Sequence, residues 1–287
     1  MPEPSKANRW LLLLLLALAC LAVPAGAAGS GVSIDPVMRG TAGANGWYVS
    51  NVTVNWTFDP LPDSTTGCDA VTITAEGHTH LDCNAWWGAT HVDYPLEIYI
   101  DKTPPTVGSV TAKHGNRSVL LAWTESADTK ISQVTRTAGP SGHSKVVYSG
   151  TDKAFRDKGL RVGTEYRYTV TAFDQAANPA ASKLGITATG ALINPVPGQR
   201  VTSPLHLAWL PKKGASYYNV QLIRGKRILS TWPTRTTLKL RKSWVYHGHH
   251  YHLRPGVYRW YVWPGLGNRE QTHYGRLLGS NTFVYGR

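Results

Sequence analysis

Beyond its first segment, this sequence of 287 residues has no long apolar run, and it has only three cysteines. No stretch after residue 23 approaches the roughly 20 apolar residues that a membrane-spanning helix needs, so we expect no stable span in the mature chain. No segment shows a sustained helical period either. The mature chain is therefore predicted to be all-β.

The sequence also lacks the motifs that mark common catalytic and cofactor sites. There is no Gly-x-Ser-x-Gly elbow, no His-Glu-x-x-His pair, no glycine-rich phosphate loop opening a helix and no supported pair of carboxylates. The densest histidine group, residues 247–252, has no carboxylate or cysteine near it in the sequence. We expect it to be an exposed or structural loop, the alternative being an adventitious metal site at His250 and His252. These absences predict a protein that is not an enzyme and has no cofactor or dedicated metal site.

The N-terminus has the layout of an export signal. Lys6 and Arg9 precede an apolar run over residues 10–23, and small residues follow at 24–28. The run is shorter than a membrane span, so we expect residues 1–28 to be a cleaved signal peptide. Two alternatives stay open: the segment is retained as an anchor, or Cys20 is lipidated. We expect a secreted, extracellular protein, or one retained at the cell surface.

Removal of the signal leaves two cysteines, Cys68 and Cys83. An exported chain with an even number of cysteines favours a disulfide. A zinc site built from these two alone is not expected, because structural zinc takes four ligands.

Positive charge is concentrated in the last third of the chain. Residues 29–188 contain 13 lysine or arginine residues against 15 acidic ones, whereas residues 189–287 contain 15 against a single acid, Glu270. A field of one sign on one module indicates a polyanionic partner.

Two segments of the chain repeat the same signals in the same order. Leu121-Ala122-Trp123 precedes a strand-like segment that contains Tyr166, and Leu207-Ala208-Trp209 precedes one that contains Tyr258. A repeat near ninety residues, with an early Trp and a late Tyr-containing strand, is typical of β-sandwich domains.

Breaker-rich segments divide the chain into three candidate domains. Residues 103–106 hold tandem prolines, and residues 194–198 are rich in proline and glycine. We therefore expect domains at 29–104, 105–188 and 189–287. Predicted strands are at 47–58, 71–74 and 96–100 in the first, at 120–123, 145–148 and 166–172 in the second, and at 217–223 and 258–262 in the third, where residues 224–227 form a hairpin turn.

The residues at the domain ends resemble known families. Residues 45–48, opening a Val-Thr-Val strand, and residues 100–105, closing the unit, resemble bacterial immunoglobulin-like domains of exported proteins. Leu160 with Tyr166, and the strand after Tyr258, resemble fibronectin type III domains and their tyrosine corner. The resemblance implies three tandem immunoglobulin-like or fibronectin type III β-sandwiches that act as spacers or binding modules.

Strand alternation divides the aromatic residues of the last domain between two faces. If Tyr258 occupies the corner position, then Tyr258, Trp260 and Val262 point to the core, together with Tyr218, Val220 and Leu222. The opposite face would then be a candidate ligand patch, which consists of Tyr217, Asn219, Gln221, Arg259, Tyr261 and Trp263. Aromatic faces beside amide and guanidinium donors suit a sugar ring or a protein hot spot. The alternative is that another domain or the segment 232–244 covers this face.

Basic residues cluster beside the patch, at Arg224, Lys226, Arg227, Lys239, Arg241 and Lys242. They predict an anionic cell-wall polysaccharide, or another surface glycan or protein, as partner; nucleic acid fits the charge but not the export. The leading hypothesis is a non-catalytic surface-binding or adhesion protein. A carbohydrate-binding accessory module and a purely structural spacer are the alternatives.

Overall fold

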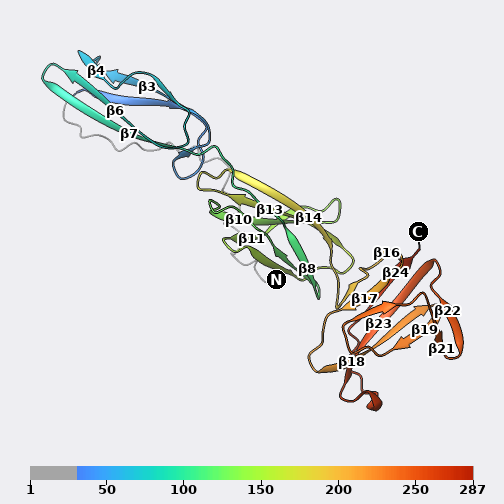
Figure 1. Cartoon of the computed structure of the whole chain (residues 1–287). Coiled ribbons are helices and arrows are strands. Elements are labelled where there is room, and N and C mark those ends of the chain that lie inside the picture. The colour runs from blue at the N-terminus through green and yellow to red at the C-terminus, as the bar shows by residue number, and fades with distance from the viewer. Residues whose placement is uncertain (1–30, 287) are drawn as a thin grey trace, which may run out of the picture. The chain divides into compact units, whose positions relative to one another are not determined.

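The structure, a computed structural model, describes residues 31–286 and is built from β-strands (Figure 1). The one helical element in this part of the chain is the short 3-10 turn Arg269–Gln271. None of the described residues belongs to a helix that is long and apolar enough to cross a membrane. The all-β prediction is confirmed, whereas the expected signal peptide and Cys20 lie outside the described residues.

The first set of strands forms two sheets, with the orders β1-β3-β5 and β2-β7-β6-β4. Its strands are Ser33–Arg39 (β1), Trp47–Tyr48 (β2), Val52–Asp59 (β3), Ser64–Thr66 (β4), Val71–Ile73 (β5), Gly77–Trp87 (β6) and Thr90–Ile100 (β7). Val52 and Val54 are buried, as the alternation along this segment predicts. The long strand β6, which includes residues 84–87, carried no clear sequence signal.

The predicted disulfide is present in this first sandwich. Cys68 and Cys83 are bonded, and Cys83 is fully buried on β6. Ile34 and Ala85 are buried in the same small core. The covalent link therefore ties the segment between β4 and β5 to the centre of a neighbouring strand.

The second sandwich has a three-stranded sheet in the order β12-β9-β8 and a four-stranded sheet in the order β11-β10-β13-β14. Its strands are Thr111–Gly115 (β8), Ser118–Ala122 (β9), Ile131–Ala138 (β10), Ser144–Gly150 (β11), Ala154–Lys158 (β12), Glu165–Phe173 (β13) and Pro179–Thr187 (β14). Three strands facing four in this order is a fibronectin type III-like sandwich.

The third sandwich repeats this plan with additions. Its sheets have the orders β15-β17-β20 and β16-β24-β23-β18-β19, and a separate two-stranded ribbon pairs β21 with β22. The strands are Leu192–Asn194 (β15), Arg200–Val201 (β16), Leu205–Trp209 (β17), Ala215–Arg224 (β18), Lys226–Thr231 (β19), Thr237–Leu240 (β20), Ser243–Tyr246 (β21), His249–His252 (β22), Gly256–Leu266 (β23) and Gly279–Tyr285 (β24). The predicted hairpin at 224–227 is confirmed, with Gly225 in the left-handed conformation that its tight turn requires.

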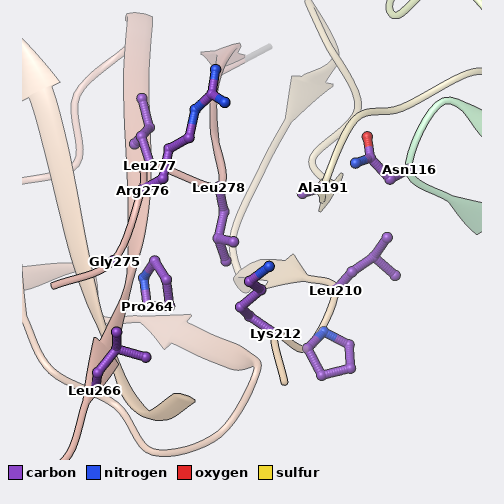
Figure 2. Close-up of a pocket in the computed structure, with 11 residues that line it drawn as sticks. Asn116, Ala191, Leu210, Lys212, Pro264, Leu266, Gly275, Arg276, Leu277 and Leu278 are labelled. Atoms are coloured by element: carbon purple, nitrogen blue, oxygen red, sulfur yellow. The ribbon is translucent and has the colours of Figure 1, made fainter. Parts of the chain in front are cut away.

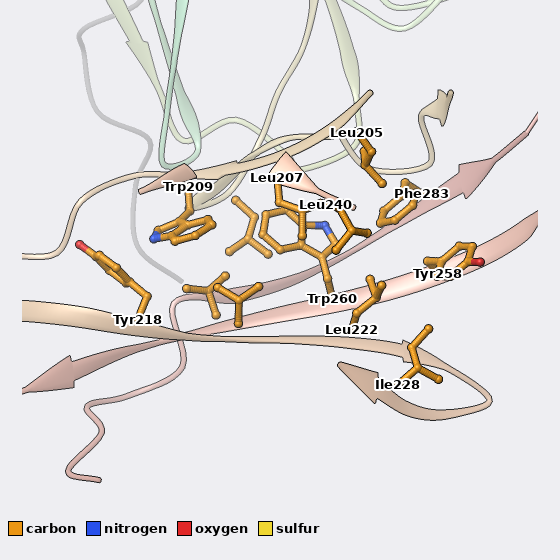
Figure 3. Packing of buried hydrophobic residues seen from close by; sticks show 13 residues of the cluster. Leu205, Leu207, Trp209, Tyr218, Leu222, Ile228, Leu240, Tyr258, Trp260 and Phe283 are labelled. Carbon is orange, nitrogen blue, oxygen red and sulfur yellow. The ribbon is translucent and has the colours of Figure 1, made fainter. Parts of the chain in front are cut away.

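The repeated tryptophans and tyrosines are the scaffold of the second and third sandwiches. Trp123 and Trp209 are both buried, and Figure 3 shows Trp209 near Trp260 within the core of the third sandwich. The backbone N–H of Arg161 donates to the Tyr166 hydroxyl over 3.0 Å.

A matching corner closes the third sandwich. The Tyr258 hydroxyl accepts from the Arg254 N–H and donates to the Arg254 carbonyl, each over 2.9 Å. Both tyrosines therefore fix the chain just before the strand they begin, as the resemblance to the tyrosine corner implies.

Candidate functional site

The predicted patch lies on the outer face of the five-stranded sheet of the third sandwich. Strands β18 and β23 pair antiparallel, which places Gln221 opposite Tyr261 and Asn219 opposite Trp263. On the other side of β23, Tyr261 is opposite Ser280. Predicted residues that are far apart in the sequence are therefore cross-strand neighbours on one surface.

Two aromatic rings form the centre of this outer face. Tyr261 and Trp263 are half-buried, and their rings are near parallel, with centroids 5.7 Å apart and an interplanar angle of 18°. This separation belongs to offset stacking, so each ring leaves part of its surface uncovered by the other. Arg259, two positions before Tyr261 on the same face, is exposed. The outer face thus presents apolar ring surface beside a guanidinium donor.

Two members of the predicted patch are buried. Their predicted exposure, on which their role as ligand contacts depended, is wrong. Tyr217 is only 2% exposed and Asn219 only 5%. The Tyr217 ring lies against Gly265, where a side chain would collide with it, and packs edge-on with Tyr274 at 6.0 Å between centroids. The Tyr274 hydroxyl in turn accepts a hydrogen bond from the Trp232 indole over 2.7 Å. The segment between β23 and β24 therefore covers the Tyr217 end of the face.

The buried Asn219 instead supports its neighbours. Its side-chain amide donates to the Ser230 hydroxyl over 3.2 Å, and its carbonyl oxygen accepts from the Gln221 amide over 2.8 Å. Half-buried Gln221 is thereby held in place beside Tyr261. Asn219 is a positioning residue, and the surface-accessible members of the outer-face patch are Gln221, Arg259, Tyr261 and Trp263.

The first group of predicted basic residues lies on the β18–β19 turn. Arg224 donates to the Pro255 carbonyl over 2.9 Å, and its guanidinium lies 5.4 Å from the centre of the Tyr258 ring. Lys226 places its ammonium 6.0 Å from the centre of the Tyr251 ring. Arg224 therefore stabilises the tyrosine corner, while Lys226 and the exposed Arg227 provide positive charge at the surface.

The second group of basic residues is at the end of β20, where the surface is hollowed on both sides of the strand. Lys239 and Arg241 line a hollow of about 270 Å³ next to β19, and they also line one of about 320 Å³ that Lys242 shares. All three side chains belong to exposed residues. The structure therefore brings Lys239 and Arg241 together at both hollows, and Lys242 joins them at the second.

The histidine group forms strand β22 and the turn before it. His250 and His252 are exposed, and they pair in register with Val245 and Ser243 of β21. Within residues 31–286, no three His, Cys, Asp or Glu side chains are grouped so that they could hold a metal ion.

A different titratable cluster lies in the first sandwich. The two ring nitrogens of His80 lie 2.7 Å from a Glu97 carboxylate oxygen and 2.8 Å from one of Asp82. Only the imidazolium form can donate to both. The hydrogen bonds with Glu97 and then Asp82 raise the pKa of His80. No sequence pattern indicated this cluster, because its members are spread over two strands.

The structure also has a pocket that no sequence pattern indicated. It has a volume of about 350 Å³, and Figure 2 shows its lining. Most of the lining is aliphatic, from Leu210, Pro264, Leu266 and Leu278 among others, with Lys212 and Arg276 as the charged members.

No family model matches this chain, and its likenesses to known proteins are partial. A poly(3-hydroxybutyrate) depolymerase from Ralstonia pickettii is 31% identical over 170 residues, which cover 53% of this chain and 35% of that protein. The chain thus spans about a third of the length of this relative. Among solved structures, a two-domain fibronectin type III segment from chicken tenascin matches with a TM-score of 0.26 and 17% identity, over 63% of this chain and 99% of that one.

Proposed function

We propose that this chain is an exported, non-catalytic protein that binds a polymer at or outside the cell surface through its third sandwich. The observation that carries the proposal is the offset-stacked pair Tyr261 and Trp263 on the outer face, next to Gln221 and Arg259. Exposed aromatic surface beside fixed polar donors is characteristic of contact sites, since the rings offer apolar area at low entropic cost. The equivalent positions of the second sandwich, Thr169 and Thr171, offer no such surface.

Anionic polysaccharide is the polymer class that the charges favour. Residues 189–287 account for all of the chain's excess positive charge, and basic residues gather at the β18–β19 turn and at the end of β20. Such a field attracts polyanions and raises their rate of association. The aromatic pair would then contact sugar rings, while the basic residues attract carboxylate, phosphate or sulfate groups.

The proposal is tested by binding of the full chain to immobilised anionic polysaccharide. Replacement of both Tyr261 and Trp263 by alanine should weaken binding roughly tenfold, because truncated aromatic anchors cost binding free energy at well-packed contacts. The matched control is the double change Thr169→Ala and Thr171→Ala at the equivalent positions of the second sandwich. Equal binding by both double variants would refute the outer-face site.

A second polymer class is favoured by the relative. Because the name of that protein includes poly(3-hydroxybutyrate), a solid polyester is a candidate ligand of the same face. The aromatic rings would contact its aliphatic groups, while Gln221 and Arg259 have donors for its ester carbonyls. Adsorption to polyester film and to polysaccharide beads, measured in parallel, separates the two. Absence of binding to either material would leave the spacer role.

A further inference from the structure

A hollow lies between two edge strands of the third sandwich, one from each sheet. Strand β19 is the last strand of the five-stranded sheet, and β20 is the last strand of the three-stranded sheet. Residues from both strands line the hollow of about 270 Å³ between them, which we call the β20 groove. An opening between two sheets gives access to side chains that otherwise belong to the core.

The lining of the β20 groove combines aliphatic and cationic side chains. Leu229 of β19 and Leu238 of β20 are only partly buried and pack against the core, as does Trp244. Lys239 and Arg241 supply the charges, and Thr231 supplies a hydroxyl. No acidic residue lines the groove. The groove therefore matches a ligand with an apolar part and a negative charge.

One wall of the groove is fixed in place by the β21–β22 ribbon. The Trp244 indole donates to the carbonyl of Ile228 over 2.6 Å, which ties the ribbon to strand β19. The Trp244 ring also stacks on Tyr251, with centroids 6.3 Å apart and an interplanar angle of 17°, and the Lys226 ammonium lies near the Tyr251 ring. A wall that is held before binding lowers the ordering cost of a ligand.

The ribbon is an addition that the sandwich fold does not require. In the second sandwich, β12 ends at Lys158 and the equivalent of β23 begins at Glu165 without an intervening strand. In the third, the connection from Leu240 to Gly256 contains both strands of the ribbon. The sandwich can close without the residues of the β21–β22 ribbon, as the second sandwich does. Formation of a groove wall gives the ribbon a role.

We propose that the β20 groove binds an amphiphilic anion, with its aliphatic chain against Leu229, Leu238 and Trp244 and its anionic head on Lys239 and Arg241. The head is a carboxylate, phosphate or sulfate, each of which accepts charge-assisted hydrogen bonds from guanidinium and ammonium groups. This site is separate from the outer-face patch, because it is lined by other strands and uses none of the patch residues.

The test uses the full chain with decanoate as the probe and decanol as its uncharged counterpart. Isothermal titration should show saturable decanoate binding that weakens roughly tenfold in the double variant Lys239→Gln and Arg241→Gln, as expected for loss of charge-assisted contacts. Binding of decanol should be weaker and should not respond to these changes. The double variant Lys213→Gln and Arg269→Gln removes equal charge from exposed residues of the same sandwich that line neither this groove nor the pocket beside Lys212, and it should bind decanoate normally.

Two further measurements distinguish the groove from the outer-face patch and identify the source of the anion. Trp244→Leu should weaken decanoate binding, whereas replacement of Tyr261 and Trp263 by alanine should leave decanoate binding unchanged. Failure of the polymer proposal can therefore be told apart from failure of the groove proposal. If the chain co-sediments with phosphatidylcholine vesicles containing phosphatidylglycerol, and if this requires Lys239 and Arg241, the anion is a membrane lipid. If the chain binds decanoate but does not co-sediment with these vesicles, the anion is a free amphiphile. Absence of saturable decanoate binding, or equal binding by both charge variants, overturns the proposal.

Discussion

One hydroxyl group, that of Tyr258, fixes the backbone at the corner of the third sandwich. The Tyr258 hydroxyl both accepts from and donates to the backbone of Arg254, and the Arg224 guanidinium lies beside it. Tyr258→Phe removes these bonds while keeping the buried ring, so we expect a loss of about 1–2 kcal/mol in the free energy of unfolding. Urea unfolding of the full chain measures this loss. Tyr246→Phe, on the β21–β22 ribbon, serves as the control and should change stability little.

His80 gives the first sandwich a proton-dependent contribution to stability. Hydrogen bonds with Glu97 and Asp82 raise its pKa in the folded state, so the imidazolium stabilises the fold at pH values below the unfolded pKa. This stabilisation is lost as the pH rises through the raised folded pKa. Across this pH interval, the melting temperature should fall less with rising pH for His80→Gln than for the unchanged chain. If the melting temperatures of the two proteins change with pH in parallel, the two carboxylates do not raise the pKa of His80 as described.

The positions of individual side chains were predictable where strand alternation alone decides them. Tyr258, Trp260 and Val262 are buried as expected, since every second residue of a strand points to the same face. Tyr217 was predicted on the correct face but is buried, because Tyr274 folds over it. The path of the long β23–β24 connection has no local periodicity in the sequence. Burial by a distant loop therefore could not be inferred from strand pattern.

At the scale of elements, the disulfide adds a covalent link to the antiparallel pairing of β4 with β6 in the first sandwich. Cys68 follows the three-residue strand β4, while Cys83 lies within the buried part of β6, 15 positions later. Replacement of both cysteines by alanine should lower the stability of this sandwich by about 3 kcal/mol, because the unfolded chain regains the entropy of the open loop. Calorimetry measures this shift. A transition unchanged by the double replacement would contradict it.

The ribbon β21–β22 shows where prediction of elements from sequence ends. The strands with clear alternation, such as β18 and β23, were predicted because their apolar residues recur at every second position. In the ribbon, apolar residues do not recur at every second position, because histidines stand among the aromatic residues. These histidines were expected to form a loop. Its pairing depends on the tie between Trp244 and Ile228, a tertiary contact that local sequence does not encode.

At the scale of the whole molecule, the second and third sandwiches share one scaffold and differ in surface. Buried Trp123 and Trp209 occupy equivalent places, as do the corner residues Tyr166 and Tyr258. These scaffold residues made the fold class predictable. The ligand was not predictable, because it depends on how exposed side chains from several strands combine. The differences between the copies are the aromatic outer face, the ribbon and the excess positive charge of residues 189–287.

The central claim is that the outer face of the third sandwich recognises a polymer. The most direct test is the binding isotherm of the full chain on immobilised anionic polysaccharide at low and high salt, with and without the double change Tyr261→Ala and Trp263→Ala. We expect salt to weaken binding of both proteins, since charge attraction is screened, and the double change to weaken it further at each salt concentration. Identical isotherms for the two proteins would contradict the account.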